Sequence, residues 1–189
     1  MKNTKKPLSL LFIVAFAITI MSFAPSGKVY LTHTGHVWFF SKTTMENIEA
    51  HNYQVGANLN SGTGDMAFSI LIKSFKFKKA LMEDHFNENY LESDKYPKST
   101  FKGKIANIGS VNFDKNGSYK VNVTGDLNMH NVTKSVNIPG IITVTQDSVY
   151  EKSNFTVALK DYNIEVPSVV KDKISETIDI HVDVAYSKK

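Results

Sequence analysis

Residues 119–145 read YKVNVTGDLNMHNVTKSVNIPGIITVT, and this stretch decides the fold. In its first half, one set of alternate positions is apolar or glycine and the other set is polar; the first set is Tyr119, Val121, Val123, Gly125, Leu127 and Met129. Such alternation predicts a long β-strand with one buried face. Residues 130–134 interrupt the pattern as a turn, and residues 135–145 return with a second alternation. The stretch therefore predicts a long antiparallel hairpin, in which Pro139 marks a bulge or an edge.

Similar alternation recurs along the rest of the chain, at residues 29–42, 51–59, 65–72, 100–105, 154–160 and 174–186. Gly35 predicts a bend or bulge in the first of these segments, residues 61–64 (SGTG) predict a turn, and the Asn116-Gly117 pair predicts a hairpin. About eight to ten strands with turns at short intervals indicate an all-β sandwich or barrel. Because a strand at each end of the chain can pair and close the sheet, we favour a closed antiparallel barrel.

One segment, residues 80–97 (ALMEDHFNENYLESDKYP), departs from the β pattern. Leu81, Met82, His85 and Phe86 recur at steps of three and four residues, which places them on one face of a short helix. The following residues are rich in Asn, Ser and Asp, and Pro97 biases the residue before it away from helix. We therefore predict a short helical and loop insertion near residues 79–97.

The first 26 residues are predicted to be a secretory signal peptide. Three lysines precede an uncharged run from Leu8 to Met21, and small residues follow it. The run has about 14 residues, fewer than the roughly 20 that a spanning helix needs, although a retained membrane anchor is the alternative. Residues 27–189 are then predicted to form one domain of a periplasmic or otherwise exported protein.

Charge and cysteine content exclude several classes of protein. The net charge of the chain is +4, and it falls to +1 once Lys2, Lys5 and Lys6 are removed with the leader. Such a near-neutral domain lacks the basic surface on which nucleic-acid binding depends. The chain contains no Cys. Disulfides, thiol catalysis and cysteine metal sites are therefore excluded.

Three segments resemble the YceI-like family of envelope proteins: ALMEDHFNENYLESDKYPKSTFKGKI (residues 80–105), VNVTGDLNMHNVTKSVNIPG (residues 121–140) and DYNIEVP (residues 161–167). The resemblance implies a closed eight-stranded, lipocalin-like antiparallel barrel. It also implies a long apolar cavity for a polyisoprenoid, an isoprenoid quinone or another long-chain amphiphile, with no cofactor beyond that ligand and no known catalytic residue. Asn131 stands where the family hairpin has Gly, and Asn tolerates a left-handed backbone, so we expect the turn to be preserved.

Ligand-binding residues are predicted in two sets. The apolar face of the insertion would cap the barrel mouth, through Leu81, Met82, His85 and Phe86. Large residues in the strands would line the cavity: Phe68, Ile70, Phe75, Phe77, Phe101, Val123, Leu127, Phe155 and Ile180. Members of the second set could instead be core residues packed against the helix, because the phase of alternation is known only strand by strand.

Polar residues near the predicted mouth are candidates for orienting the head group of a ligand. They are Asp84, His85, Asn87, Tyr96 and His130. Each also has a structural interpretation. Asp84 and Asn87 suit a helix cap or a solvated face, and His85 suits an anchor to the barrel wall. Tyr96 could pack beneath the loop, and His130 could serve the turn.

The functional alternatives differ in what fills the barrel, since eight strands enclose either packed side chains or one ligand. A filled barrel needs no cap, so the insertion favours a ligand. No hydrolase, HExxH or paired-carboxylate motif is present, and we do not predict an enzyme. His33 and His36, three residues apart on a strand, are expected on opposite faces, which does not suit a metal site.

We therefore predict an exported lipid-binding protein that carries, stores or senses a long-chain isoprenoid. Transient contact with a membrane surface and a homodimer are both compatible with this role. The alternative is a structural or partner-binding envelope barrel with a filled core.

Overall fold

The computed structural model describes residues 27–187, and the predicted signal peptide lies outside the described residues. Within that range the chain forms nine β-strands and one short α-helix, α1 (Ala80–His85). The strand bounds are β1 Val29–Lys42, β2 Asn47–Asn60, β3 Asp65–Leu71, β4 Lys76–Phe77, β5 Lys98–Ile105, β6 Gly117–Met129, β7 Val132–Val144, β8 Ser148–Ala158 and β9 Thr177–Ser187.

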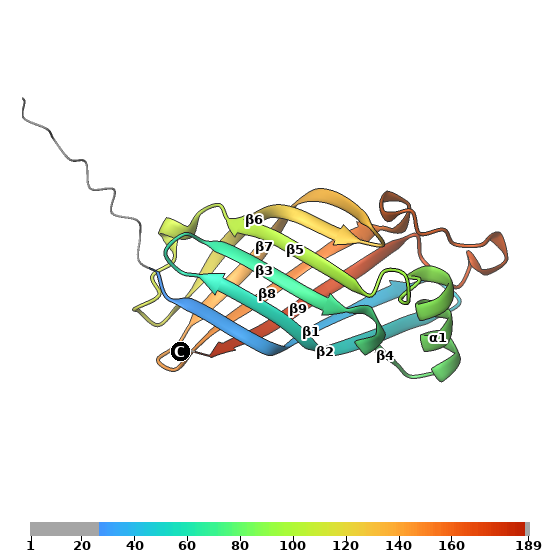
Figure 1. The fold of residues 1–189 in the computed structure, drawn as a ribbon, viewed down its shortest axis with the longest axis horizontal. Coiled ribbons are helices and arrows are strands. Elements are labelled where there is room, and N and C mark those ends of the chain that lie inside the picture. Colours follow the sequence, from blue (N-terminus) through green and yellow to red (C-terminus); the bar gives the residue numbers. More distant parts are fainter. Residues whose placement is uncertain (1–26, 188–189) are drawn as a thin grey trace, which may run out of the picture.

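Eight of the strands form a closed antiparallel ring. Their order is β1-β9-β8-β7-β6-β5-β3-β2, and the pairing of β1 with β2 closes the ring. The two-residue strand β4 adds to β2 at Ala50 and His51. In Figure 1 the strands run obliquely along an elongated barrel, and α1 lies at one of its ends. The predicted closed eight-stranded antiparallel barrel with a short helical insertion is therefore confirmed.

The hairpin of β6 and β7 forms as the alternation predicts, but the turn predicted at residues 130–134 is shorter, because β7 already begins at Val132. The two strands pair without a register shift from Gly117↔Val144 to Met129↔Val132. His130 and Asn131 form the turn, with φ of 50° and 61°. Two consecutive residues with positive φ are the mark of the tight turn whose twist matches that of the flanking strands. Asn131 thus takes the left-handed conformation expected of it.

Pro139 lies where the pairing of β7 with β8 ends. On the β8 side, β7 is paired only from Gly140 to Val144. Pro139 itself still lies opposite Asn122 of β6. Because proline has no N–H to donate, it is tolerated at the boundary of a ladder rather than within it. The predicted edge is therefore present, limited to one side of the strand.

One end of the barrel is packed solid. Its fully buried side chains come from the strand ends that meet there, and the largest are Tyr30, Leu59, Ile105, Ile142, Val144, Val149 and Tyr186. We call this the closed end. The barrel core of this end is built by the alternation itself, because every second residue of each strand points inward.

The connection between β5 and β6 covers the closed end of the barrel. The prediction of a hairpin turn at Asn116-Gly117 was wrong. Ile105 pairs directly with Val123, and Gly117 pairs with Val144 instead of turning the chain. Val111 is buried, and Phe113 stacks on Tyr30 with ring centroids 5.7 Å apart. Val111 and Phe113, which precede the Asn116-Gly117 pair, therefore pack onto the end of the barrel.

A bulge in β1 changes which residues face inward. Thr32 pairs with Ala57 and Gly35 with Val55, so three steps along β1 match two along β2. Thr32 and Gly35 consequently both face the interior, and the expectation that His33 and His36 lie on opposite faces was wrong. His33 is exposed, and His36 stacks on the exposed Tyr53, with centroids 4.1 Å apart. The bulge predicted at Gly35 is present.

The other end of the barrel carries α1 and the segment between β8 and β9 (Figure 1). That segment contains two short 3-10 helices, Leu159–Tyr162 and Ser168–Val170. Leu159, Tyr162 and Ile164 are buried at its start. None of the helices in residues 27–187 is long and apolar enough to cross a membrane. We call the end of the barrel that carries α1 the α1 end.

Candidate functional site

The barrel is hollow toward the α1 end. A cavity of about 590 Å³ lies between the closed end and α1, and it reaches the surface beside the exposed side chains of Leu81 and His85. All the residues predicted as cap or wall lie along it: Leu81, Met82, His85, Phe86, Phe68, Ile70, Phe75, Phe77, Phe101, Val123, Leu127, Phe155 and Ile180. That these residues contact a ligand stays a prediction.

The two halves of the barrel explain why the periodicity of the sequence could not distinguish a filled barrel from a hollow one. Both halves place every second residue inside, and the inward residues of both are large and apolar. At the closed end Phe113, from the connection between β5 and β6, stacks on Tyr30 and so covers the interior. Toward the α1 end, Phe68 and Phe101 are paired on the neighbouring strands β3 and β5, with ring centroids 6.2 Å apart, so both rings lie along the barrel wall.

Glycines in two neighbouring strands help to keep the Phe101 ring against the wall. A Cβ built on Gly103 would lie 2.3 Å from Cζ of Phe101, and one built on Gly125 would lie 2.4 Å from Cα of Gly103. Gly103 and Gly125 pair with each other across β5 and β6. The bare backbone of this pair accommodates the ring, since no side chain stands between them.

An aromatic cluster closes the cavity beneath the helix. Phe86 lies 5.6 Å from Phe39 of β1, 5.6 Å from Phe75 and 5.1 Å from Phe77, measured between ring centroids. Aromatic pairs at such distances contribute about 0.5–1.5 kcal/mol beyond the burial of their area. Phe86 begins a single π-helical turn, Phe86–Tyr90, that continues α1. The turn swings its residues around the mouth, so that Tyr90 and Leu91 also line the cavity.

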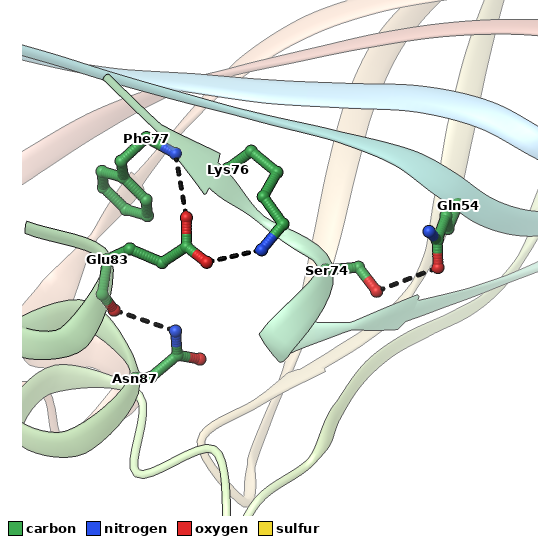
Figure 2. A network of polar contacts seen from close by, with 6 residues as sticks. All are labelled: Gln54, Ser74, Lys76, Phe77, Glu83 and Asn87. Atoms are coloured by element: carbon green, nitrogen blue, oxygen red, sulfur yellow. Dashed lines mark hydrogen bonds and ion pairs between the residues drawn. The ribbon is translucent and has the colours of Figure 1, made fainter. Parts of the chain in front are cut away.

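The helix is fastened to β4 through one carboxylate (Figure 2). Glu83 pairs with Lys76 at 2.5 Å through Oε1 and accepts the Phe77 backbone N–H at 3.3 Å through Oε2. Asn87 donates to the carbonyl of Glu83 at 2.8 Å. The bond from Lys76 is the main reason that the pKa of Glu83 lies below its usual value. A six-residue helix is too short to be stable alone, so these bonds and the Phe86 cluster hold it.

One buried carboxyl interrupts the apolar lining. Glu151 of β8 lines the cavity and is 5% exposed, and its Oε2 accepts a hydrogen bond from the Tyr186 hydroxyl at 2.5 Å. Burial raises the pKa of Glu151 to about 7. Tyr186 belongs to the packed closed end, and the β8 residues that follow at steps of two, Ser153, Phe155 and Val157, run toward the α1 end. Glu151 therefore forms the floor of the cavity.

Comparison with known proteins identifies the family that has this architecture. The family model for the YceI-like domain matches residues 25–186. The chain belongs to the YceI-like family. A search of curated proteins gave no match.

Solved structures share the fold of this YceI-like chain at low sequence identity. A polyisoprenoid binding domain from Saccharophagus degradans is 13% identical, with a TM-score of 0.74 over 86% of this chain and 99% of that one. BcnA of Burkholderia cenocepacia is 18% identical, with a TM-score of 0.68 over 80% and 95%. The Campylobacter jejuni YCEI protein is 16% identical, with a TM-score of 0.61 over 78% and 89%. At these identities the likeness is one of fold.

The head-group candidates of this YceI-like domain occupy different places. Among the five, His85 alone lines the cavity. It is exposed on α1, and no hydrogen bond of its side chain is present among residues 27–187, so it does not anchor the helix as the structural interpretation required. Asp84 is exposed on α1. Asn87 belongs to the Glu83 network, and its Oδ1 is buried without a partner in the described chain.

Tyr96 and His130 hold the loop after α1 against the barrel. The His130 ring bonds the Tyr162 carbonyl at 3.0 Å and Oε2 of Glu92 at 2.8 Å. Tyr96 packs edge-on against the same ring, with centroids 4.8 Å apart. The bond from His130 is the main reason that the pKa of Glu92 is lowered. These positions favour the structural interpretation of both residues.

Sequence reasoning missed the cavity floor. Phe155, Val157 and Leu159 were recognised as one face of a strand, and the same phase extended backward reaches Ser153 and Glu151. Those positions are polar, so the apolar pattern ended before them. The parity of the strand was the signal that could have found Glu151.

Proposed function

We propose that this YceI-like domain is an exported lipid-binding protein that holds one long-chain isoprenoid, or a similar amphiphile, inside the barrel. The hollow half of the barrel carries this proposal. A volume of about 590 Å³ is typical of small-molecule sites, and its wall is overwhelmingly apolar. The name of the Saccharophagus degradans domain, which calls that protein polyisoprenoid-binding, supports the same ligand class. A carrier, a store or a sensor of lipid would all use such a cavity.

The size of the cavity bounds the enclosed part of the ligand. At about 30 Å³ per heavy atom, the share of a water molecule in the liquid, the cavity accommodates roughly 20 heavy atoms. That corresponds to about four isoprene units. Burial of apolar chain contributes about 0.8 kcal/mol for each CH₂, so such a ligand binds tightly with little polar help. Any longer chain leaves through the mouth beside α1.

The mouth also suits brief contact with a membrane surface, from which a lipid must be taken. Three exposed apolar side chains lie in loops or helices of the α1 end: Met45 is 67% exposed, Leu81 64% and Val169 87%. They come from three separate connections, between β1 and β2, in α1, and between β8 and β9. Exposed apolar patches mark sites of interaction with proteins or membranes.

A filled structural barrel is not favoured by the site. Side chains pack the interior at the closed end and leave it hollow beneath α1. The name of the Saccharophagus degradans domain supports binding as the role of such a barrel. We therefore take lipid binding as the function.

A substitution that fills the cavity is expected to prevent binding. Val123 lines the wall and Thr124, its neighbour on β6, is exposed outside the barrel. V123W places an indole in the space of the ligand, whereas T124W places the same group in solvent. We expect V123W to weaken retention of tritiated geranylgeraniol in gel filtration by at least about tenfold, because a few displaced CH₂ groups are worth that much.

The matched variant T124W should bind as the wild type does. Circular dichroism would confirm that both variants keep the barrel. Equal retention by V123W and T124W would show that the lipid does not enter the barrel.

A further inference from the structure

The floor of the cavity has an incomplete hydrogen-bond arrangement. Tyr186 donates to Oε2 of Glu151, and Oε1 has no hydrogen-bond partner among residues 27–187. Glu151 as a residue is only 5% exposed, and it lines the cavity, so the unpartnered oxygen opens onto the cavity and is not enclosed by protein. A carboxyl removed from water without a full set of partners is destabilising. A group with this burden at the floor of an apolar cavity points to a ligand that supplies the missing partner.

No cation among residues 27–187 compensates Glu151. The two lysines that line the cavity, Lys79 and Lys173, belong to the α1 end, one directly before α1 and the other after the last 3-10 helix. Burial raises the pKa of Glu151 to about 7, so the carboxyl is mainly protonated below that pH. A protonated carboxyl has one O–H to donate. Tyr186 already occupies Oε2, which leaves Oε1 for a ligand.

We propose that Glu151 is a head-group subsite, and that the ligand enters with its polar end first. The head group is uncharged and carries an oxygen that hydrogen-bonds the carboxyl, as in an alcohol, a ketone, a quinone or an amide. The apolar chain then runs from the floor toward α1. This inference rests on the proposed function and specifies which end of the lipid the cavity recognises.

Length and neighbouring groups agree with this orientation. Glu151 and Val157 both line the cavity and are six residues apart, which corresponds to roughly 20 Å along β8 at about 3.3 Å per residue. Ser153, the next inward residue, donates its hydroxyl hydrogen to the Pro139 carbonyl at 2.7 Å, so its oxygen remains able to accept. The floor thus offers a donor and an acceptor to one small polar group.

The same arrangement rejects an anionic head group. A phosphate or carboxylate at the floor would meet a carboxyl with no cation to neutralise it, and burial of an unpaired charge is strongly unfavourable. A lipid diphosphate would instead leave its head at the α1 end, near Lys173. Head-in binding is therefore specific to uncharged amphiphiles.

The test compares ligands with related C20 chains and different ends: geranylgeraniol, the hydrocarbon phytane, and geranylgeranyl diphosphate. In E151L, we expect the ratio of the affinity for geranylgeraniol to that for phytane to fall by about tenfold relative to the wild type, the worth of one hydrogen bond. E151Q, whose amide can still donate and accept, should restore most of the ratio. The ratio of diphosphate to phytane should not fall.

Tyr150 is the matched control, because it is the exposed neighbour of Glu151 on β8. Y150L should keep the wild-type ratios. An unchanged ratio of geranylgeraniol to phytane in E151L would overturn the subsite while leaving lipid binding intact. If the wild type binds none of the three lipids, the proposed function is overturned, and this inference with it.

A spectroscopic measurement on the wild type removes the dependence on variants. Infrared difference spectra should show the C=O stretch of a protonated carboxyl moving to lower frequency when geranylgeraniol binds, and not when phytane binds. Identical spectra with the two ligands would contradict the contact.

Discussion

Raising the pH from about 5 to about 8 is expected to lower the free energy of unfolding of the wild type by roughly 2 to 3 kcal/mol more than that of E151Q. The pKa of Glu151 is raised from 4.5 to about 7 in the folded protein by burial. The folded state therefore binds the proton more tightly than the unfolded chain. This stabilisation is complete below about pH 4.5, declines as the pH rises to about 7, and is lost above it.

Urea unfolding of both proteins at several pH values would measure the effect. Every other titrating group is shared, so its contribution cancels in the difference between the two proteins. The direct partner, Tyr186, does not titrate in this range, because its pKa is raised well above 10 by burial. Parallel curves for the wild type and E151Q would show that Glu151 is not the buried, protonated floor described above.

The double substitution M82D/F86D is expected to weaken the binding of geranylgeraniol by about 100-fold or more. Each change removes roughly 1.5–3 kcal/mol of apolar burial. Phe86 leaves the cluster with Phe39, Phe75 and Phe77, and two carboxylates take its place and that of Met82 at the mouth. Retention of tritiated geranylgeraniol would measure the loss.

The barrel should survive this change. The ring is formed by pairings among eight strands, which are β1, β2, β3, β5, β6, β7, β8 and β9. None of these pairings involves α1. The β signal in circular dichroism is therefore expected to persist. A80D/N89D is the matched control, since it adds the same charge at two exposed positions of the same segment that do not line the cavity. Equal loss of binding in the two double variants would show that charge, and not the cap, is responsible.

The barrel could be predicted from the sequence because its strands alternate and its key turn is local. In β6 and β7 the inward set, including Val123, Leu127 and Ile142, is separated from the outward set by strand parity alone. Asn131 was expected to tolerate the positive φ that it takes at the turn, although the turn was predicted over residues 130–134 and only His130 and Asn131 form it. Helical periodicity placed Met82 and Phe86 on one face of the insertion, and both line the cavity.

Other features depend on contacts between distant segments, and local pattern did not reveal them. The Asn116-Gly117 pair lies in a connection whose shape is decided by the packing of Phe113 on Tyr30. His130 was predicted from the sequence to lie near the mouth of the barrel. Its ring is instead hydrogen-bonded to the Tyr162 carbonyl and the Glu92 carboxylate. Glu151 is a polar residue in an inward phase, which a search for apolar positions passes over.

Native mass spectrometry of the protein purified without detergent from its own type of host would show whether the barrel holds a lipid. We expect one bound lipid per chain, and solvent extraction of the same sample should yield a long-chain amphiphile with an uncharged oxygen head group. V123W prepared in parallel should carry little or none of it. A wild-type protein that is free of lipid, or that carries the same lipid as V123W in equal amount, would contradict the account.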